Sequence, residues 1–261
     1  MAKNRLDILL VEKGLVDSRS LAQRLVMAGQ VRVNGQVIFK PADKVDEKAE
    51  FTIDHGPRYV SRGGEKLEAA LLAFGITGLE GGICADVGAS TGGFTDCLLQ
   101  HGAGHVYAID VGYGILHWKI RQDRRVTVME RTNARTIAHL PEPVDWVTMD
   151  ASFISLKILL PVIKNWVANT GQIIALIKPQ FEAGRREAAR GEGVIRDPQV
   201  HRSVLQDVLS AAVAEGYRVR GLIRSPLLGP KGNTEFLVWM DILPTHTINL
   251  NSVIDPLFQQ E

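Results

Sequence analysis

Four charged residues stand at the ends of apolar runs or beside glycines, where a solvated surface charge is not required. They are Lys66 in SRGGEKL, Asp150 in TMDASF, Lys178 in LIKPQF and Glu235 in KGNTEF. Asp150 and Lys178 each close an apolar run that is typical of a buried strand. In an open α/β sheet the carboxyl ends of the strands face the ligand crevice. We therefore expect the four side chains to converge there, where lysines and carboxylates can position a substrate and move protons.

A glycine-rich turn follows the first strand of the predicted sheet, in the sequence ADVGASTGGF of residues 85–94. Such a turn between a buried strand and a helix brings the backbone close to a ligand. The turn is not a phosphate loop, because it lacks Gly-Lys-Ser/Thr, and it matches G-x-G-x-x-G poorly. The second strand ends in Asp110, twenty-two residues after Gly88. An acidic residue there suits hydrogen bonds to ribose hydroxyls.

Two cofactors fit this pattern, a dinucleotide and S-adenosylmethionine. Asp86 favours the methyl donor, because a carboxylate repels a pyrophosphate but can hold a cationic methionine end through charge and water. Asn133, after the third strand, can approach the adenine or serve as a turn residue. The candidate cofactor-binding residues are Asp86, Gly88, Ala89, Ser90, Gly92, Gly93, Phe94, Asp110, Val111 and Asn133.

The first 58 residues read as a small unit of mixed α and β structure. The pattern predicts a helix over 4–14, then a second helix capped by Asp17 or Ser18 and ending near Ala28. Residues 31–38 predict two strands around an Asn34-Gly35 turn, and a further strand follows at 49–53. A joint at His55-Gly56-Pro57 closes the unit. Residues 1–44 carry eight basic and four acidic side chains, a net +4, which favours nucleic acid only where a motif agrees.

The remainder reads as a parallel α/β sheet. A helix is expected at 65–74, and apolar strands at 83–87, 105–110, 126–130, 145–150 and 171–177 alternate with helical stretches. Two further strands, 217–224 and 235–241, predict an antiparallel hairpin at the sheet edge. Residues 244–261 show no clear period and predict a loose tail. The predicted domains are therefore 1–58 and 59–243, followed by a tail at 244–261.

Composition narrows the class of protein. The polar N-terminus has no apolar run typical of a signal peptide, and no stretch reaches the roughly 20 apolar residues of a membrane span. Cys84 and Cys97 lie in apolar surroundings and read as reduced core thiols of a cytoplasmic protein. His101 and His105 are separated by Gly102 and Gly104, which argues against a helical metal pair. We expect neither a metal nor a membrane partner.

The motifs together resemble those of a known protein family. Lys66, Asp150, Lys178 and Glu235 look like the Lys-Asp-Lys-Glu tetrad of the FtsJ/RrmJ-like RNA 2′-O-methyltransferases. Together with DVGASTGGFT, SRGGEK and GEGVIRDP (191–198), they make the chain similar to the TlyA (hemolysin A) family over residues 3–242. The N-terminal RLD, GLVDSR and GQVRVNG segments resemble an S4-type RNA-binding domain.

The resemblance implies a Rossmann-like class I methyltransferase sheet, mostly parallel with an antiparallel C-terminal edge hairpin, joined to a small α+β S4-type domain. It implies methylation of ribosomal RNA at a cytidine 2′-hydroxyl, with S-adenosylmethionine as cofactor. The partners would be ribosomal RNA or ribosomal subunits in the cytoplasm. The candidate RNA-binding residues are Arg5, Arg19, Arg24, Arg32, Arg62, Arg185 and Arg190.

Roles within the tetrad follow from the resemblance and from acid–base chemistry. A 2′-hydroxyl is a weak nucleophile, so the protein must align it and remove its proton. We assign Lys178 as the general base, Asp150 as its orienting partner, and Lys66 and Glu235 as positioning groups for the ribose and its phosphate. Burial and a second cation favour the neutral lysine that a base requires, whereas the two carboxylates favour the charged form.

Two alternatives come from other functional classes. The family's second name points to a membrane-active hemolysin, although no strongly basic amphipathic helix supports this function. An inactive methyltransferase fold serving as an RNA-binding assembly factor is the other alternative, and the complete tetrad argues against it. The sequence indicates neither the target nucleotide nor the oligomeric state.

Overall fold

The computed structural model describes residues 3–54, 56–184, 187, 191–243 and 249–259. The chain divides into two compact units, residues 1–58 and 59–261. Each unit has its own apolar core, and the second contains two large clusters of buried side chains, one on each face of its sheet.

The first unit combines two helices with short strands. In chain order it contains β1 (Lys3–Arg5), α1 (Leu6–Glu12), α2 (Arg19–Met27), β2 (Val31–Val33), β3 (Gln36–Val37), β4 (Lys44–Asp46) and β5 (Phe51–Ile53). The Ser18 hydroxyl caps α2 by accepting from the Leu21 amide at 3.3 Å. The Asn34-Gly35 turn has positive φ at both residues, 48° and 79°, which is the conformation that an Asn-Gly hairpin favours.

One element of this unit differs from the prediction. The helix expected at 4–14 begins only at Leu6, because residues 3–5 pair with 44–46 as an antiparallel strand. The spacing of Leu6, Leu9 and Leu10 predicts the helix correctly. The strand at 3–5 could not be predicted in this way, because its partner lies about 40 residues away in the chain. All three leucines are buried, and Leu6 and Leu10 share an apolar cluster with Ala22 and Val26 of α2.

The second unit is built on one mixed sheet. Its helices are α3 (Gly63–Ala73), α4 (Gly93–Gln100), α5 (Trp118–Arg121), η1 (Ala134–Thr136), α6 (Leu156–Ile163), α7 (Pro179–Glu182), α9 (Pro198–Ala214), α10 (Asn251–Ile254) and η2 (Asp255–Phe258). Its strands are β6 (Ile83–Val87), β7 (His105–Ile109), β8 (Val126–Met129), β9 (Val144–Met149), β10 (Val167–Ile177), β11 (Arg218–Arg224) and β12 (Phe236–Asp241).

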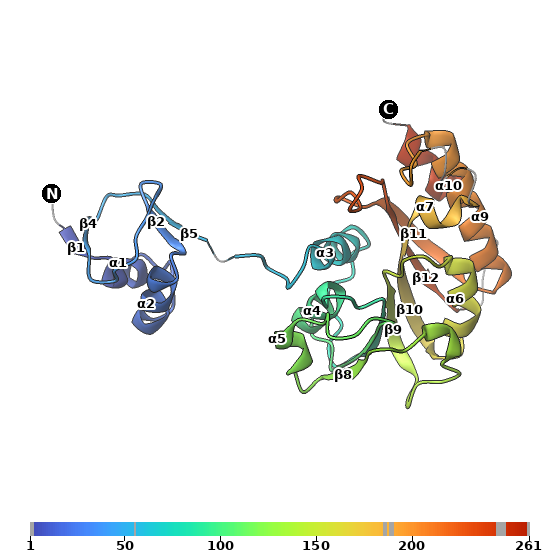
Figure 1. The fold of residues 1–261 in the computed structure, drawn as a ribbon, viewed down its shortest axis with the longest axis horizontal. Coiled ribbons are helices and arrows are strands. Elements are labelled where there is room, and N and C mark those ends of the chain that lie inside the picture. The colour runs from blue at the N-terminus through green and yellow to red at the C-terminus, as the bar shows by residue number, and fades with distance from the viewer. Residues whose placement is uncertain (1–2, 55, 185–186, 188–190, 244–248, 260–261) are drawn as a thin grey trace. The chain divides into compact units, whose positions relative to one another are not determined.

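The strand order is β11-β12-β10-β9-β6-β7-β8. The strands β6 to β10 pair in parallel, whereas β12 runs antiparallel to both β10 and β11. Figure 1 shows α3 and α4 on one face of this sheet and α6 and α9 on the other. The predicted fold class, a mostly parallel α/β sheet with an antiparallel edge, is confirmed.

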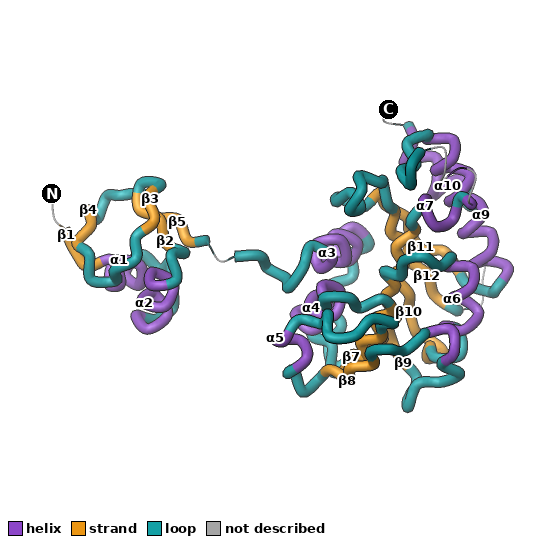
Figure 2. Tube along the Cα trace, in the orientation of Figure 1, coloured by secondary structure: helices purple, strands orange, loops and turns teal. Residues whose placement is uncertain are grey.

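The C-terminal end differs from the expected loose tail. Residues 251–258 form α10 and η2, and α10 lies beside α9 in Figure 2. Ile254 is fully buried, and Leu250, Val253, Leu257 and Phe258 pack around it against the sheet. The Arg224 guanidinium donates to the Leu257 carbonyl at 3.2 Å. The helices α10 and η2 each span only four residues, which is too short for a helical period to stand out in the sequence.

Replacement of Ile254 by alanine should lower the free energy of unfolding by about 2–4 kcal/mol, because it leaves a cavity in a packed core. Tryptophan fluorescence in urea measures this unit alone, since Trp118, Trp146, Trp166 and Trp239 all lie in residues 59–261. Leu72→Ala is the control, because Leu72 is 71% exposed. Equal small effects of the two substitutions would mean that the C-terminal residues are not part of the core.

Candidate active site

The four predicted charged residues form two lysine–carboxylate ion pairs. Lys178 Nζ lies 2.6 Å from Asp150 Oδ1, and Lys66 Nζ donates to Glu235 Oε2 at 2.5 Å. Asp150 and Lys178 follow the adjacent parallel strands β9 and β10, so their side chains emerge at the same edge. Lys66 lies on α3, and Glu235 immediately precedes β12.

Burial makes both pairs sensitive to the loss of either partner. The two lysine side chains are each 10% exposed and Glu235 is 1% exposed, whereas Asp150 retains 23%. An isolated buried charge is strongly unfavourable, so each lysine requires its carboxylate. Charges held in this way keep a fixed position, which is the property that a catalytic group needs.

Two cavities adjoin the pairs. A small one of about 210 Å³ is lined by Lys66, Asp150, Ser61, Arg62 and the turn residues Gly88, Ala89, Ser90, Gly93 and Phe94. A larger one of about 950 Å³ is lined by Gly88, Ser90, Asp110, Val111, Asn133, Asp150, Ser152 and Phe153, among others. Gly88, Ser90 and Asp150 belong to both linings. The cavities therefore meet where the glycine-rich turn approaches Asp150.

The backbone of the turn adopts the left-handed conformation at three positions, two of which are glycines. Gly88, Ser90 and Gly92 have positive φ values of 84°, 50° and 95°. Asp110 holds the turn in place, because its two oxygens accept from the amides of Ser90 at 2.8 Å and Gly112 at 2.7 Å. Glycine is also required at position 92 for steric reasons, because a side chain there would contact Leu116 and Ile120.

Asp86 lies near the end of β6, under the glycine-rich turn. It is fully buried beneath the turn and lines neither of these cavities. Its carboxylate accepts from the hydroxyls of Thr95 at 2.6 Å and Thr148 at 3.0 Å. Neither cavity reaches Asp86 in this structure, and its contact with a cofactor stays a prediction. Asp86 joins β6 to α4 and β9 beneath the turn.

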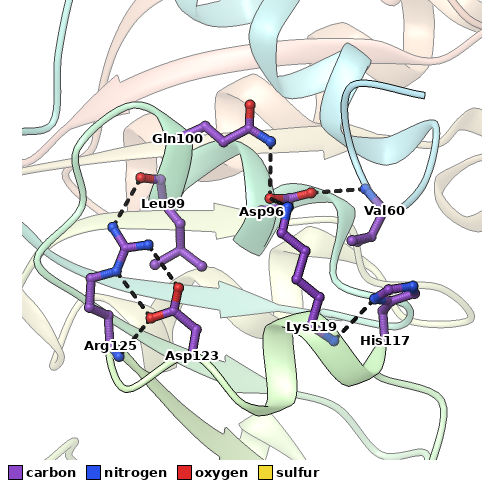
Figure 3. A network of polar contacts seen from close by, with 8 residues as sticks. All are labelled: Val60, Asp96, Leu99, Gln100, His117, Lys119, Asp123 and Arg125. Carbon is purple, nitrogen blue, oxygen red and sulfur yellow. Dashed lines mark hydrogen bonds and ion pairs between the residues drawn. The ribbon is translucent and has the colours of Figure 1, made fainter. Parts of the chain in front are cut away.

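A second polar network fixes the segment that precedes Lys66. Figure 3 shows Asp96 of α4 accepting hydrogen bonds from the Val60 amide and the Gln100 side chain, at 2.9 and 3.0 Å. Lys119 of α5 reaches the same carboxylate at 3.4 Å. A side chain on Gly93 would come within 2.2 Å of Ser61 Oγ. The segment at 60–64 therefore packs directly on the glycine-rich turn.

Sequence reasoning missed Asp96 and two other polar groups. Ser152 accepts a hydrogen bond from Lys178, and Asp7 accepts from Arg5, Arg19 and Gln23. Asp7 is fully buried, and its contacts with the two arginines hold the pKa of its carboxyl far below the ordinary range. Most of these partners lie far from each residue in the chain, so spacing gave no signal for them.

The predicted RNA-binding arginines fall into three groups. Arg5 and Arg19 are held side by side by Asp7 and are 38% and 54% exposed, while Arg24 and Arg32 are exposed elsewhere in the first unit. Arg62 lines the small cavity of the second unit. Arg185 and Arg190 lie outside the described residues.

The described residues were also compared with the requirements of a metal site and of a membrane-spanning helix. Within the described ranges, no group of three or more His, Cys, Asp or Glu side chains is placed to hold a metal ion. Over the same residues, none of the helices combines the length and apolar character needed to cross a membrane.

Comparison with known proteins identifies the class. An FtsJ-like methyltransferase model matches residues 59–242, and an S4 domain model matches residues 4–51. The sheet and the crevice at its carboxyl edge are thus those of an FtsJ-like methyltransferase, fused to an S4 domain. Sequence relatives narrow this class further, and the chain belongs to the TlyA (hemolysin A) family.

The relatives cover nearly the whole chain. The 16S/23S rRNA (cytidine-2′-O)-methyltransferase TlyA of Mycobacterium tuberculosis is 45% identical over 90% of this chain and 89% of its own length. Hemolysin A of Brachyspira hyodysenteriae is 42% identical, over 89% and 98%. A solved structure from Streptococcus thermophilus, described as a candidate hemolysin, has 41% identity and a TM-score of 0.72, covering 100% of this chain and 97% of that one.

The burial of Asp86 gives a pH-dependent prediction. Burial raises the pKa of its carboxyl from 3.8 to about 6, while the bonds from Thr95 and Thr148 lower it in part. The folded protein then binds this proton more tightly than the unfolded chain. Asp86 therefore contributes stability below about pH 4 that is lost as the pH rises through about 6.

Asp86→Asn removes this titration. The free energy of unfolding of the wild type, minus that of the variant, should fall by about 2–3 kcal/mol between pH 4 and pH 7, at about 1.4 kcal/mol per pH unit. Urea unfolding followed by tryptophan fluorescence measures the difference at each pH. A difference that stays constant over this range would contradict the burial of an ionisable carboxyl beneath the turn.

Proposed function

We propose that this protein uses S-adenosylmethionine to methylate ribosomal RNA at the 2′-hydroxyl of a cytidine. The observation that carries the proposal is the pair of buried lysine–carboxylate contacts beside the glycine-rich turn, at the junction of two cavities. The names of the TlyA relatives supply the substrate class, ribosomal RNA, and the methylated atom. Such a substrate implies action in the cytoplasm, on free RNA or on a ribosomal subunit.

The donor atoms around the larger cavity fit the proposed cofactor. Each Asp110 oxygen accepts one backbone hydrogen bond and keeps a further lone pair for a ribose hydroxyl. The Asn133 Oδ1 atom accepts from the Arg135 amide at 3.1 Å, which leaves its amide nitrogen to face an adenine. Val111 is 70% exposed and adds apolar surface for the base. S-adenosylmethionine, when bound, supplies a methyl group activated on a sulfonium.

The residues of the small cavity fit the acceptor. Lys66 and Asp150 face the cavity, while Glu235 lies behind Lys66 and Lys178 lies behind Asp150. Lys66 can hold the phosphate or a ribose oxygen through charge and hydrogen bonds, and Arg62 in the same lining can contact a phosphate. Glu235 orients Lys66 in this proposal. Asp150 orients Lys178, which receives the proton of the 2′-hydroxyl.

The S4-type unit supplies affinity for the RNA in this proposal. Arg5 and Arg19 share the Asp7 carboxylate, so their guanidinium groups are oriented before RNA arrives and lose less freedom on binding. Their remaining N–H groups suit the oxygens of successive phosphates, and Arg24 and Arg32 extend the basic surface. This binding is expected to weaken with added salt, because phosphate contacts release counterions.

An in vitro assay tests the function directly. The purified chain, a donor labelled in the methyl group and ribosomal RNA from cells lacking the protein are incubated together, and the RNA is then hydrolysed in alkali. A 2′-O-methyl group blocks cleavage of the neighbouring phosphodiester, so the label should appear in dinucleotides. Label found in mononucleotides would indicate methylation of a base. Transfer to protein or to nothing would overturn the proposal.

Lys178→Arg tests the role of the base. An arginine keeps the positive charge but is effectively never neutral in a protein, so it cannot accept the proton. We expect the single-turnover rate of methyl transfer to fall at least about 100-fold, the lower range of general-base catalysis. Binding of the cofactor and of RNA, measured by calorimetry, should persist. A rate within about tenfold of wild type would move the role of base to Asp150 or to water.

A further inference from the structure

Three oxygen atoms of the β9–α6 loop lie close to Lys178 Nζ. Its Nζ lies 2.6 Å from Asp150 Oδ1, 2.9 Å from Ser152 Oγ and 3.3 Å from the Asp150 carbonyl oxygen. Nζ donates hydrogen bonds to Ser152 Oγ and to the Asp150 carbonyl oxygen, whereas its contact with Asp150 Oδ1 is an ion pair. A lysine that acts as a base must first lose one proton to solvent. Its free lone pair must then lie within reach of the proton that it accepts.

The three neighbours differ in what they can do. The ionised carboxylate and the carbonyl oxygen of Asp150 only accept hydrogen bonds, whereas a serine hydroxyl both donates and accepts. A neutral amine keeps two N–H donors, and these match the two Asp150 oxygens. Of the three described atoms around Nζ, only Ser152 Oγ can therefore donate to the lone pair. A neutral amine that donates to both Asp150 oxygens would turn its lone pair toward Ser152.

The cavities lead to the same residue. Ser152 lines the larger cavity and Asp150 lines both, whereas Lys178 is 8% exposed and lines neither of the two. A hydroxyl at the junction of the cavities meets Asp150, and on the side of the larger cavity it meets Ser152, before it meets Lys178. A proton that leaves this hydroxyl can reach Lys178 through Ser152, whose hydroxyl can accept one proton while it gives up another.

The loop that carries Ser152 is held at both ends. The Asp150 amide donates to the Val87 carbonyl at 2.9 Å, which fixes the start of the loop to β6. At the other end, Glu182 accepts from the Ser155 hydroxyl at 2.5 Å and from the Leu156 amide at 2.7 Å. A relay needs donor and acceptor atoms at steady hydrogen-bond distances, and this loop provides them.

We propose that Ser152 relays the proton from the ribose 2′-hydroxyl to Lys178. The 2′-hydroxyl proton passes to Ser152 Oγ while the proton of Ser152 passes to the neutral Lys178 amine, which becomes an ammonium. The 2′-oxygen forms its bond to the methyl carbon, and the electron pair of the broken carbon–sulfur bond stays on sulfur. Ser152 ends as it began. This inference rests on the proposed function and adds a residue to its reaction.

Three variants and a solvent-isotope experiment test the relay. Ser152→Ala removes the relay and Ser152→Thr restores a hydroxyl. Ser210→Ala is the control, because it removes an exposed hydroxyl on α9 that accepts from Gln206. Single-turnover methyl transfer is measured at saturating donor and RNA, in mixtures of H₂O and D₂O. Cofactor affinity is measured by calorimetry for each variant.

We expect Ser152→Ala to slow methyl transfer at least about tenfold, a part of the range of proton-transfer catalysis, with cofactor affinity retained. Ser152→Thr should recover most of the rate. In wild type and in Ser210→Ala, the rate should depend on the D₂O fraction along a curve, because two protons move in one step. In Ser152→Ala the dependence should become linear.

A linear dependence in wild type, or an unchanged rate in Ser152→Ala, would overturn the relay and leave Asp150 or water as the first proton acceptor. Loss of rate in both Ser152→Ala and Ser152→Thr, with the wild-type curvature kept, would also overturn it and assign Ser152 a packing role. Failure of the proposed function looks different, because wild type itself would then transfer no methyl group to a 2′-hydroxyl.

Discussion

The functional edge of the sheet depends on the close approach of two backbones, those of Gly88 and Asp150. The Asp150 amide bonds the Val87 carbonyl at 2.9 Å, and a side chain on Gly88 would lie 2.8 Å from the Asp150 carbonyl oxygen. Only glycine allows this contact, and its φ of 84° also favours glycine. The contact makes the glycine-rich turn and the catalytic carboxylate neighbours, and so joins the two cavities.

The ion pairs depend on that geometry. With Asp150 fixed against the turn, Lys178 on the next parallel strand has a carboxylate within 2.6 Å. Lys66 on α3 lines the small cavity and donates to Glu235 behind it at 2.5 Å. Buried ion pairs contribute little net stability, but removal of one partner costs about 3–5 kcal/mol. The pairs are therefore best explained by chemistry, because apolar residues of similar size would serve stability equally well.

Much of this arrangement was readable from the sequence. Apolar runs ending in Asp150 and Lys178 placed both at strand ends, and the resemblance joined Lys66 and Glu235 to them. The partners of Asp86 could not be predicted, because Thr95 and Thr148 come from α4 and β9, nine and 62 residues away. Ser152 escaped notice for a similar reason, since its contact with Lys178 spans 26 residues. Spacing predicts elements and strand ends, whereas hydrogen-bond partners require the fold.

The most direct test of the central claim maps 2′-O-methylation across the ribosomal RNA of cells with and without this protein. Resistance of each phosphodiester to alkali gives the map, and a strain carrying the Lys178→Arg chain separates catalysis from mere binding. The account predicts that one or more methylated cytidines disappear when the protein is absent, return with the wild-type chain and stay absent with the variant. Identical maps in all strains, or full restoration by Lys178→Arg, would contradict it.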